Sequence, residues 1–148
     1  MDPLSIAGTC VALTATATKL GTELTRFVMR CRESKDDLAG MSRQISSLKM
    51  ALELLSDDLK PEEGACRVPD SFRPQLNPML DNCRDILTEL GSILSAYTAR
   101  PKSTGVKWAV FGKDKVLSLE KQLDAHVKAL NVTLSCVSLY VLPYYLPR

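Results

Sequence analysis

The sequence predicts an all-α fold, a four-helix bundle with a long N-terminal helix. Apolar residues recur at steps of three and four in four separate stretches, which is the period of one face of an α-helix. Prolines and glycines lie between the stretches and would end each helix. No stretch alternates apolar and polar residues as a half-buried β-strand would. A chain of 148 residues is long enough to bury these apolar faces in one shared core.

The first helix is predicted to run from Pro3 to about Arg32. Asp2 can cap its free N–H groups, and a proline in the first position sacrifices no hydrogen bond. Its apolar stripe comprises Ile6, Cys10, Leu13, Ala17, Leu20, Leu24, Phe27 and Cys31. The sixteen residues from Pro3 to Thr18 carry no charge, are rich in threonine and include Gly8. Both residue types are poor helix formers, glycine by about 1 kcal/mol relative to alanine. This helix therefore depends on what it packs against, either the rest of the chain or, on activation, a membrane.

The second helix is predicted to follow Ser34, because a capping side chain there precedes the acidic Asp36 and Asp37. It should end before Pro61. Its apolar stripe is the most regular in the chain and comprises Leu38, Met41, Ile45, Leu48, Leu52, Leu55 and Leu59. Such a stripe also occurs in intermolecular coiled coils, but the short connections between the helices favour packing within the chain.

The third helix is predicted to begin near Asn77 and Pro78 and to stop at Arg100 and Pro101. Its stripe comprises Leu76, Leu80, Cys83, Leu87, Leu90, Leu94 and Tyr97. The stripe of the fourth helix comprises Val116, Leu119, Leu123, Val127, Leu130, Leu134 and Val137.

Residues 1–137 are expected to form one domain, and residues 138–148 an irregular apolar tail, because this segment is aromatic and interrupted by proline. Neither end of the chain predicts a membrane-spanning helix. The uncharged run of the first helix is shorter than the ~20 residues that a span needs. The nineteen uncharged residues from Ala129 to Pro147 contain several polar side chains and Pro143.

Few residues could support catalysis or bind a metal. His126 is the single histidine, which excludes histidine-based triads and multi-histidine metal sites. The five cysteines are scattered, odd in number and without a CxxC pair, so we expect reduced thiols in the cytoplasm and no zinc site. Gly112 and Lys113 resemble the end of a phosphate-binding loop. Lys107, however, stands where that motif needs its first glycine, and Asp114 where it needs serine or threonine. We therefore expect no enzyme, no cofactor and no small-molecule substrate.

The segment from Arg100 to Lys115 is basic and contains two aromatic residues. It carries a local charge of +4, although the whole chain carries only +2. A candidate patch for anionic lipid or a protein partner comprises Arg100, Lys102, Lys107, Trp108, Lys113 and Lys115. In the alternative interpretation, Trp108 and Phe111 pack beneath a solvated loop and anchor the start of the fourth helix. Nucleic-acid binding is not expected, because four excess charges make a small footprint and no recognition motif is present.

Three stretches of the chain resemble the fungal HeLo-like N-terminal domain, which precedes NACHT-type NTPase or ankyrin-repeat regions in STAND (NLR-like) proteins. The domain is also named after the N-terminal part of azaphilone pigments biosynthesis cluster protein L. The stretches are MDPLSIAGTCVALTATATKL, LAGMSRQISSLKMALELL and VKWAVFGKDKVLSLEKQLDAHVKALNVTLSCV. The resemblance covers about residues 1–137. The chain differs from the family in carrying no NTPase or repeat region and in its tail after about Ser138.

The resemblance implies a non-enzymatic signalling or effector domain of the fungal NLR type, in the cytoplasm and membrane-associated on activation. In the wider HeLo-related group, the N-terminal helix is released to enter membranes and cause programmed cell death, as in heterokaryon incompatibility. The corresponding candidate membrane-active residues here are Leu4, Ile6, Val11, Leu13 and Leu20.

Two other functions stay open at this point. The chain could be an adaptor bundle that binds protein partners, either a second copy of itself or an NLR-type regulator, without any membrane step. It could also be an accessory protein of a secondary-metabolite gene cluster.

Overall fold

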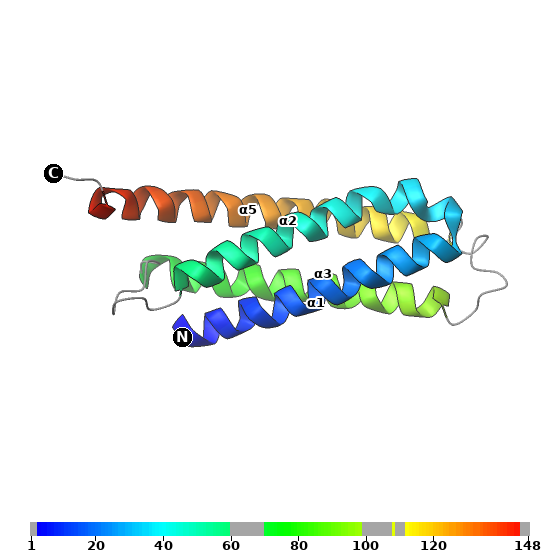
Figure 1. The fold of residues 1–148 in the computed structure, drawn as a ribbon, viewed down its shortest axis with the longest axis horizontal. Coiled ribbons are helices and arrows are strands. Elements are labelled where there is room, and N and C mark those ends of the chain that lie inside the picture. The colour runs from blue at the N-terminus through cyan, green and yellow to red at the C-terminus, as the bar shows by residue number, and fades with distance from the viewer. Residues whose placement is uncertain (1–2, 60–69, 99–107, 109–111, 146–148) are drawn as a thin grey trace.

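The computed structural model describes residues 3–59, 70–98, 108 and 112–145. Its long helices are α1 (Pro3–Arg30), α2 (Lys35–Leu59), α3 (Arg73–Thr98) and α5 (Lys113–Tyr145). Two short 3-10 helices, η1 (Arg32–Ser34) and η2 (Asp70–Phe72), precede α2 and α3. The described part of the chain contains no strand, and its four long helices lie side by side along one axis (Figure 1). The predicted all-α four-helix bundle with a long N-terminal helix is confirmed.

The helices form a ring in the order α1, α2, α5, α3. The main contacts join α1 to α2 and α3, and join α5 to the same two helices. In Figure 1, α1 and α3 run in one direction and α2 and α5 in the other. In this ring α2 and α3, although consecutive in sequence, lie diagonally opposite each other. The groove that matters below lies between α1 and α3, which are neighbours in space but not in sequence.

The core is built from the four predicted stripes. Every predicted stripe residue of α1, α2 and α5 is buried, and α3 departs from the prediction only at Tyr97, which is half-buried. Removing one such leucine or phenylalanine side chain from water contributes about 1.5–3 kcal/mol, so the sum of many such contributions stabilises helices with weak intrinsic propensity. The periodicity identified most of the core because each helix buries a single face, and Ala51, Ile86 and Trp108 are buried in addition.

The turn between α1 and α2 begins slightly earlier than predicted. The first helix ends at Arg30, and the N–H of Cys31 donates to the carbonyl of Phe27 at 2.8 Å. Ser34 directly precedes α2, as expected, but its hydroxyl donates to the carbonyl of Cys31 at 2.6 Å. This buried hydroxyl therefore closes the turn and does not cap α2.

The third helix begins earlier than predicted, at Arg73, and it contains Pro78. Proline is tolerated near a helix start because the first N–H groups have no partner within the helix. Pro78 lies just past the first turn and costs the single hydrogen bond to the carbonyl of Pro74. The predicted start at Asn77 and Pro78 was wrong because the proline was taken as a boundary.

The fourth long helix also continues further than predicted. It extends to Tyr145, past Pro143, and projects beyond the ends of the other helices (Figure 1). The expectation of irregular structure from Ser138 was wrong as far as Tyr145, because a proline in the last turn removes only one hydrogen bond. The domain boundary at residue 137 stays a prediction. Among the described residues, no helix combines the length and the apolar character needed to cross a membrane.

Candidate functional site

The threonines of α1 bond to their own helix. The hydroxyls of Thr14, Thr16, Thr18, Thr22 and Thr25 each donate to the carbonyl four residues earlier, at 2.8–3.2 Å. Such back-bonding satisfies the hydroxyl donor without water and slightly weakens the helix. The surface of α1 is therefore neutral and only weakly polar along its first half.

The predicted membrane-active stripe lies in the core. Ile6, Leu13 and Leu20 expose at most 4% of their surface, whereas Val11 is 61% exposed. Leu4 belongs to α1, but its side chain lies outside the description. A membrane could reach the three buried side chains only after α1 separates from α2 and α3. Of the four candidate residues whose side chains are described, Val11 is the exposed one.

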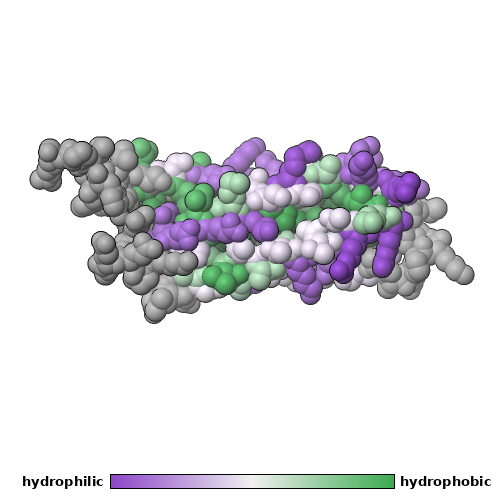
Figure 2. Space-filling view, viewed as in Figure 1, coloured by the Kyte–Doolittle hydropathy of each residue, from purple (hydrophilic) through white to green (hydrophobic). Residues whose placement is uncertain are grey.

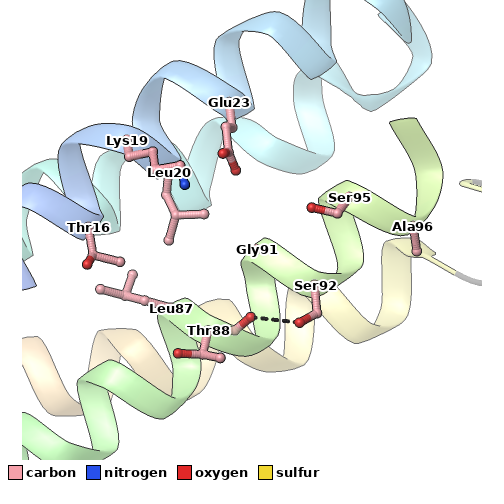
Figure 3. A pocket seen from close by; sticks show the side chains of 10 residues that line it. All are labelled: Thr16, Lys19, Leu20, Glu23, Leu87, Thr88, Gly91, Ser92, Ser95 and Ala96. Carbon is pink, nitrogen blue, oxygen red and sulfur yellow. Dashed lines mark hydrogen bonds between the residues drawn. The ribbon is translucent and has the colours of Figure 1, made fainter. Parts of the chain in front are cut away.

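A groove of about 680 Å³ lies between α1 and α3 (Figure 3). It is lined by Thr16, Lys19, Leu20 and Glu23 from α1 and by Leu87, Thr88, Gly91, Ser92, Ser95 and Ala96 from α3. The buried Leu20 and Leu87 form its floor. The α3 side consists mainly of small residues, which leave the space open. At Gly91, an added Cβ would lie 3.4 Å from Cδ2 of Leu20, an ordinary contact distance.

Two opposite charges lie at the rim of this groove. Lys19 and Glu23 are separated by one helical turn and therefore lie on the same face of α1, and both line the groove (Figure 3). Neither forms an ion pair within the described part of the chain. The groove thus combines a partly apolar floor with uncommitted charges of both signs, which is the composition of a protein-binding surface.

Large apolar side chains are scattered over the rest of the surface. The exposed ones are Val11, Met29, Met50, Leu54, Val132 and Leu139. On the face seen in Figure 2, hydrophilic and hydrophobic side chains are interspersed over the described helices. Scattered apolar residues of this kind are common on globular proteins and do not define a site.

The predicted basic patch is divided by the structure. Trp108 is 1% exposed and packs against Phe27 and Tyr97, with ring centroids 5.1 and 5.9 Å away. Its Nε1–H donates to Oδ2 of Asp37 at 3.1 Å. Trp108 is therefore part of the core and is not presented to a partner in this conformation. This supports the alternative interpretation, in which the tryptophan packs beneath the loop.

The remaining patch residues lie at the surface or outside the description. Lys113 is half-exposed and pairs with Oδ1 of Asp37 at 3.5 Å, and Lys115 is exposed. Asp37 thus accepts a hydrogen bond from Trp108 and forms an ion pair with Lys113. The other members, Arg100, Lys102 and Lys107, together with Phe111, lie outside the described residues. An anionic-lipid or partner role for these lysines and arginines stays a prediction.

A second polar group links α2 to α5. Gln44 donates to Oδ1 of Asp124 at 2.9 Å, and Lys128 pairs with Oδ2 at 2.8 Å. The hydrogen bond from Lys128 lowers the pKa of Asp124, desolvation opposes this shift, and the bond from Gln44 adds to it. The hydrogen bond between Gln44 and Asp124 joins these two helices, whereas the ion pair of Lys128 lies within α5.

The buried thiols of Cys10 and Cys83 offer little reactivity. Burial raises the pKa of Cys10 to about 12 and that of Cys83 to about 11, so both stay protonated at neutral pH. Among the described residues, no group of histidine, cysteine and carboxylate side chains could hold a metal ion. His126 lies half-buried on α5.

The fold and the described surface define a helical-bundle domain with a groove between α1 and α3. The chain belongs to the family described as pigment biosynthesis cluster protein PigL N-terminal, whose model matches residues 1–142. This confirms the predicted resemblance to the pigment-cluster domain, whereas the relation to HeLo-like domains stays a prediction. No curated protein and no solved structure matches the chain.

Proposed function

We propose that the chain is a non-enzymatic signalling domain of the cytoplasm that acts by binding protein partners. The observation that carries this proposal is the groove between α1 and α3, which has a partly apolar floor and rim charges of both signs. A partner helix could bury the exposed parts of the floor and pair with Lys19 and Glu23. The family name associates the domain with pigment biosynthesis clusters, so the partners include proteins encoded near such a cluster.

Substitution of Ser92 by arginine tests this proposal. Ser92 lines the groove and is exposed, so Ser92→Arg fills the groove without disturbing the core. Ser135→Arg is a matched control, because Ser135 is also exposed on a helix and its hydroxyl also bonds to the carbonyl four residues earlier. We expect Ser92→Arg to abolish the cellular response to overexpression of the chain, including any growth arrest or change in pigment. Equal responses from both variants, with unchanged circular dichroism, would contradict the proposal.

Binding to membranes is a second candidate function. It is favoured by the sixteen uncharged residues at the start of α1 and by threonine hydroxyls that are already satisfied within that helix. In this version α1 separates from the bundle and enters an anionic membrane, which links the chain to NLR-type signalling and cell death. The test is dye leakage from phosphatidylserine-containing vesicles, with the protein free and after forced oligomerisation. Absence of leakage in both states rules this version out.

A further inference from the structure

Lys19 and Glu23, the rim charges of the α1/α3 groove, are arranged so that they can pair with the same two residues of a second copy of the chain. In an antiparallel pair of α1 helices related by a two-fold axis near Gly21, each residue faces the one equally far on the other side of the axis. Lys19 of one copy then faces Glu23 of the other, and Glu23 faces Lys19. Both residues line the groove (Figure 3). The two contacts between the copies therefore form together.

We propose that the groove between α1 and α3 is a self-association surface that binds a second copy of this chain in the antiparallel register just described. This inference rests on the proposed function, because it names the partner of the same groove. It requires no residue outside the described helices.

The neighbouring residues are compatible with this register. Arg26 is exposed on the same face of α1, one turn beyond Glu23. The two-fold axis places Arg26 opposite Thr16 of the other copy, so no like charges meet along α1. The small side chains of Ser92, Ser95 and Ala96 allow the second copy to approach closely, because they take up little of the groove.

Another groove on the described helices lacks this charge symmetry. It lies between α1 and α2, has a volume of about 470 Å³, and is lined by Val11, Thr14, Ala15, Glu53, Ser56 and Asp57. Its charged residues, Glu53 and Asp57, are both acidic. A second copy docked symmetrically there would bring carboxylates together, which is unfavourable. Charge therefore favours the α1/α3 groove for self-association.

The contact is small and partly polar, so the dimer should be weak and sensitive to salt. Interfaces below about 1,200 Å² of total buried area are typical of transient complexes. Exposed ion pairs are screened at ionic strengths above about 0.1 M. Self-association should therefore be visible at high protein concentration and low salt.

Charge reversal tests the proposed register. Sedimentation velocity of the full 148-residue chain is measured over a range of concentrations at low salt. We expect Lys19→Glu and Glu23→Lys each to weaken dimer formation about tenfold or more, because each turns both attractive contacts into repulsive ones. The double variant Lys19→Glu/Glu23→Lys should restore the dimer. An equimolar mixture of the two single variants should form a heterodimer. Lys121→Glu, at an exposed site on α5, is the control and should change nothing.

Two results would overturn the inference. One is a wild-type chain that stays monomeric at about millimolar concentration, where even very weak specific pairs associate. The other is a dimer that Lys19→Glu does not weaken or that the double variant does not restore, with folding verified by circular dichroism. A monomeric chain whose Ser92→Arg variant still loses its cellular response leaves the proposed function standing, with a different protein in the groove. If the wild-type chain does not dimerise and the Ser92→Arg variant keeps the cellular response, both proposals are contradicted.

Discussion

At the residue scale, Trp108 shows how one side chain can join parts of the chain that are far apart in sequence. Its ring packs on Phe27 and Tyr97, and its indole N–H donates to Asp37, 71 residues earlier. The sequence around Trp108 left both a surface role and a buried role open. Asp37 was predicted only as an acidic residue at a helix start. Its second role depends on the three-dimensional proximity of α2 and Trp108, which local spacing does not encode.

Gly112 is the residue that makes room for this tryptophan. A Cβ added there would lie 2.6 Å from Cε3 of Trp108 and 3.1 Å from Cε2 of Tyr97. Because these rings are held in the core, Gly112→Ala should lower the free energy of unfolding by about 1–3 kcal/mol. Urea denaturation followed by fluorescence of Trp108, the single tryptophan, measures this change. An unchanged midpoint would show that the rings shift without cost.

At the element scale, the stripes predicted which faces of the helices are buried but not where the helices end. The error at Pro78 and the error after Ser138 have the same cause. A proline removes one hydrogen bond, and near a helix terminus that loss is too small to end the helix. Leu76 and Leu80, on either side of Pro78, are both buried. Packing therefore decided where α3 begins, and the local preference of Pro78 did not.

The glycines of α1 provide a test of its weak helix propensity. A Cβ at Gly8 or Gly21 would meet nothing within 4 Å, so Gly8→Ala and Gly21→Ala add helix propensity without a clash. Each should raise the free energy of unfolding by about 0.5–1 kcal/mol, or the melting temperature by about 2–4 °C. Ala12→Gly, at an exposed site of the same helix, should lower stability by a similar amount. Thermal melts by circular dichroism measure all three, and a destabilised Gly8→Ala variant would contradict this account of α1.

At the scale of the whole molecule, the ring order of the helices creates the candidate site. Lys19 and Glu23 were ordinary charges in the sequence, and Ser92, Ser95 and Ala96 were ordinary small residues on a polar face. They form one groove because α1 and α3 are neighbours although α2 lies between them in sequence. Four stripes of equal period fit more than one ring order, so the sequence alone predicted the bundle without predicting this surface.

The whole-molecule arrangement also separates the two proposed functions experimentally. Val11 on α1 and Val132 on α5 are 61% and 63% exposed, so a charge at either site should be tolerated by the folded bundle. In the membrane version the two sites differ, because α1, which carries Val11, enters the bilayer, whereas α5, which carries Val132, stays in the bundle. A charge at the centre of an inserted helix costs about 2.5–3.5 kcal/mol.

If α1 enters membranes, Val11→Glu should reduce leakage of phosphatidylserine-containing vesicles about tenfold or more, since 1.4 kcal/mol corresponds to a factor of ten. Val132→Glu should leave leakage unchanged. If the chain acts only through the α1/α3 groove, both variants should retain wild-type sedimentation behaviour and cellular response. Melting temperatures within a few degrees of wild type for both variants are the control for folding. A loss of leakage that is equal in the two variants would show that added negative charge, and not insertion of α1, is responsible.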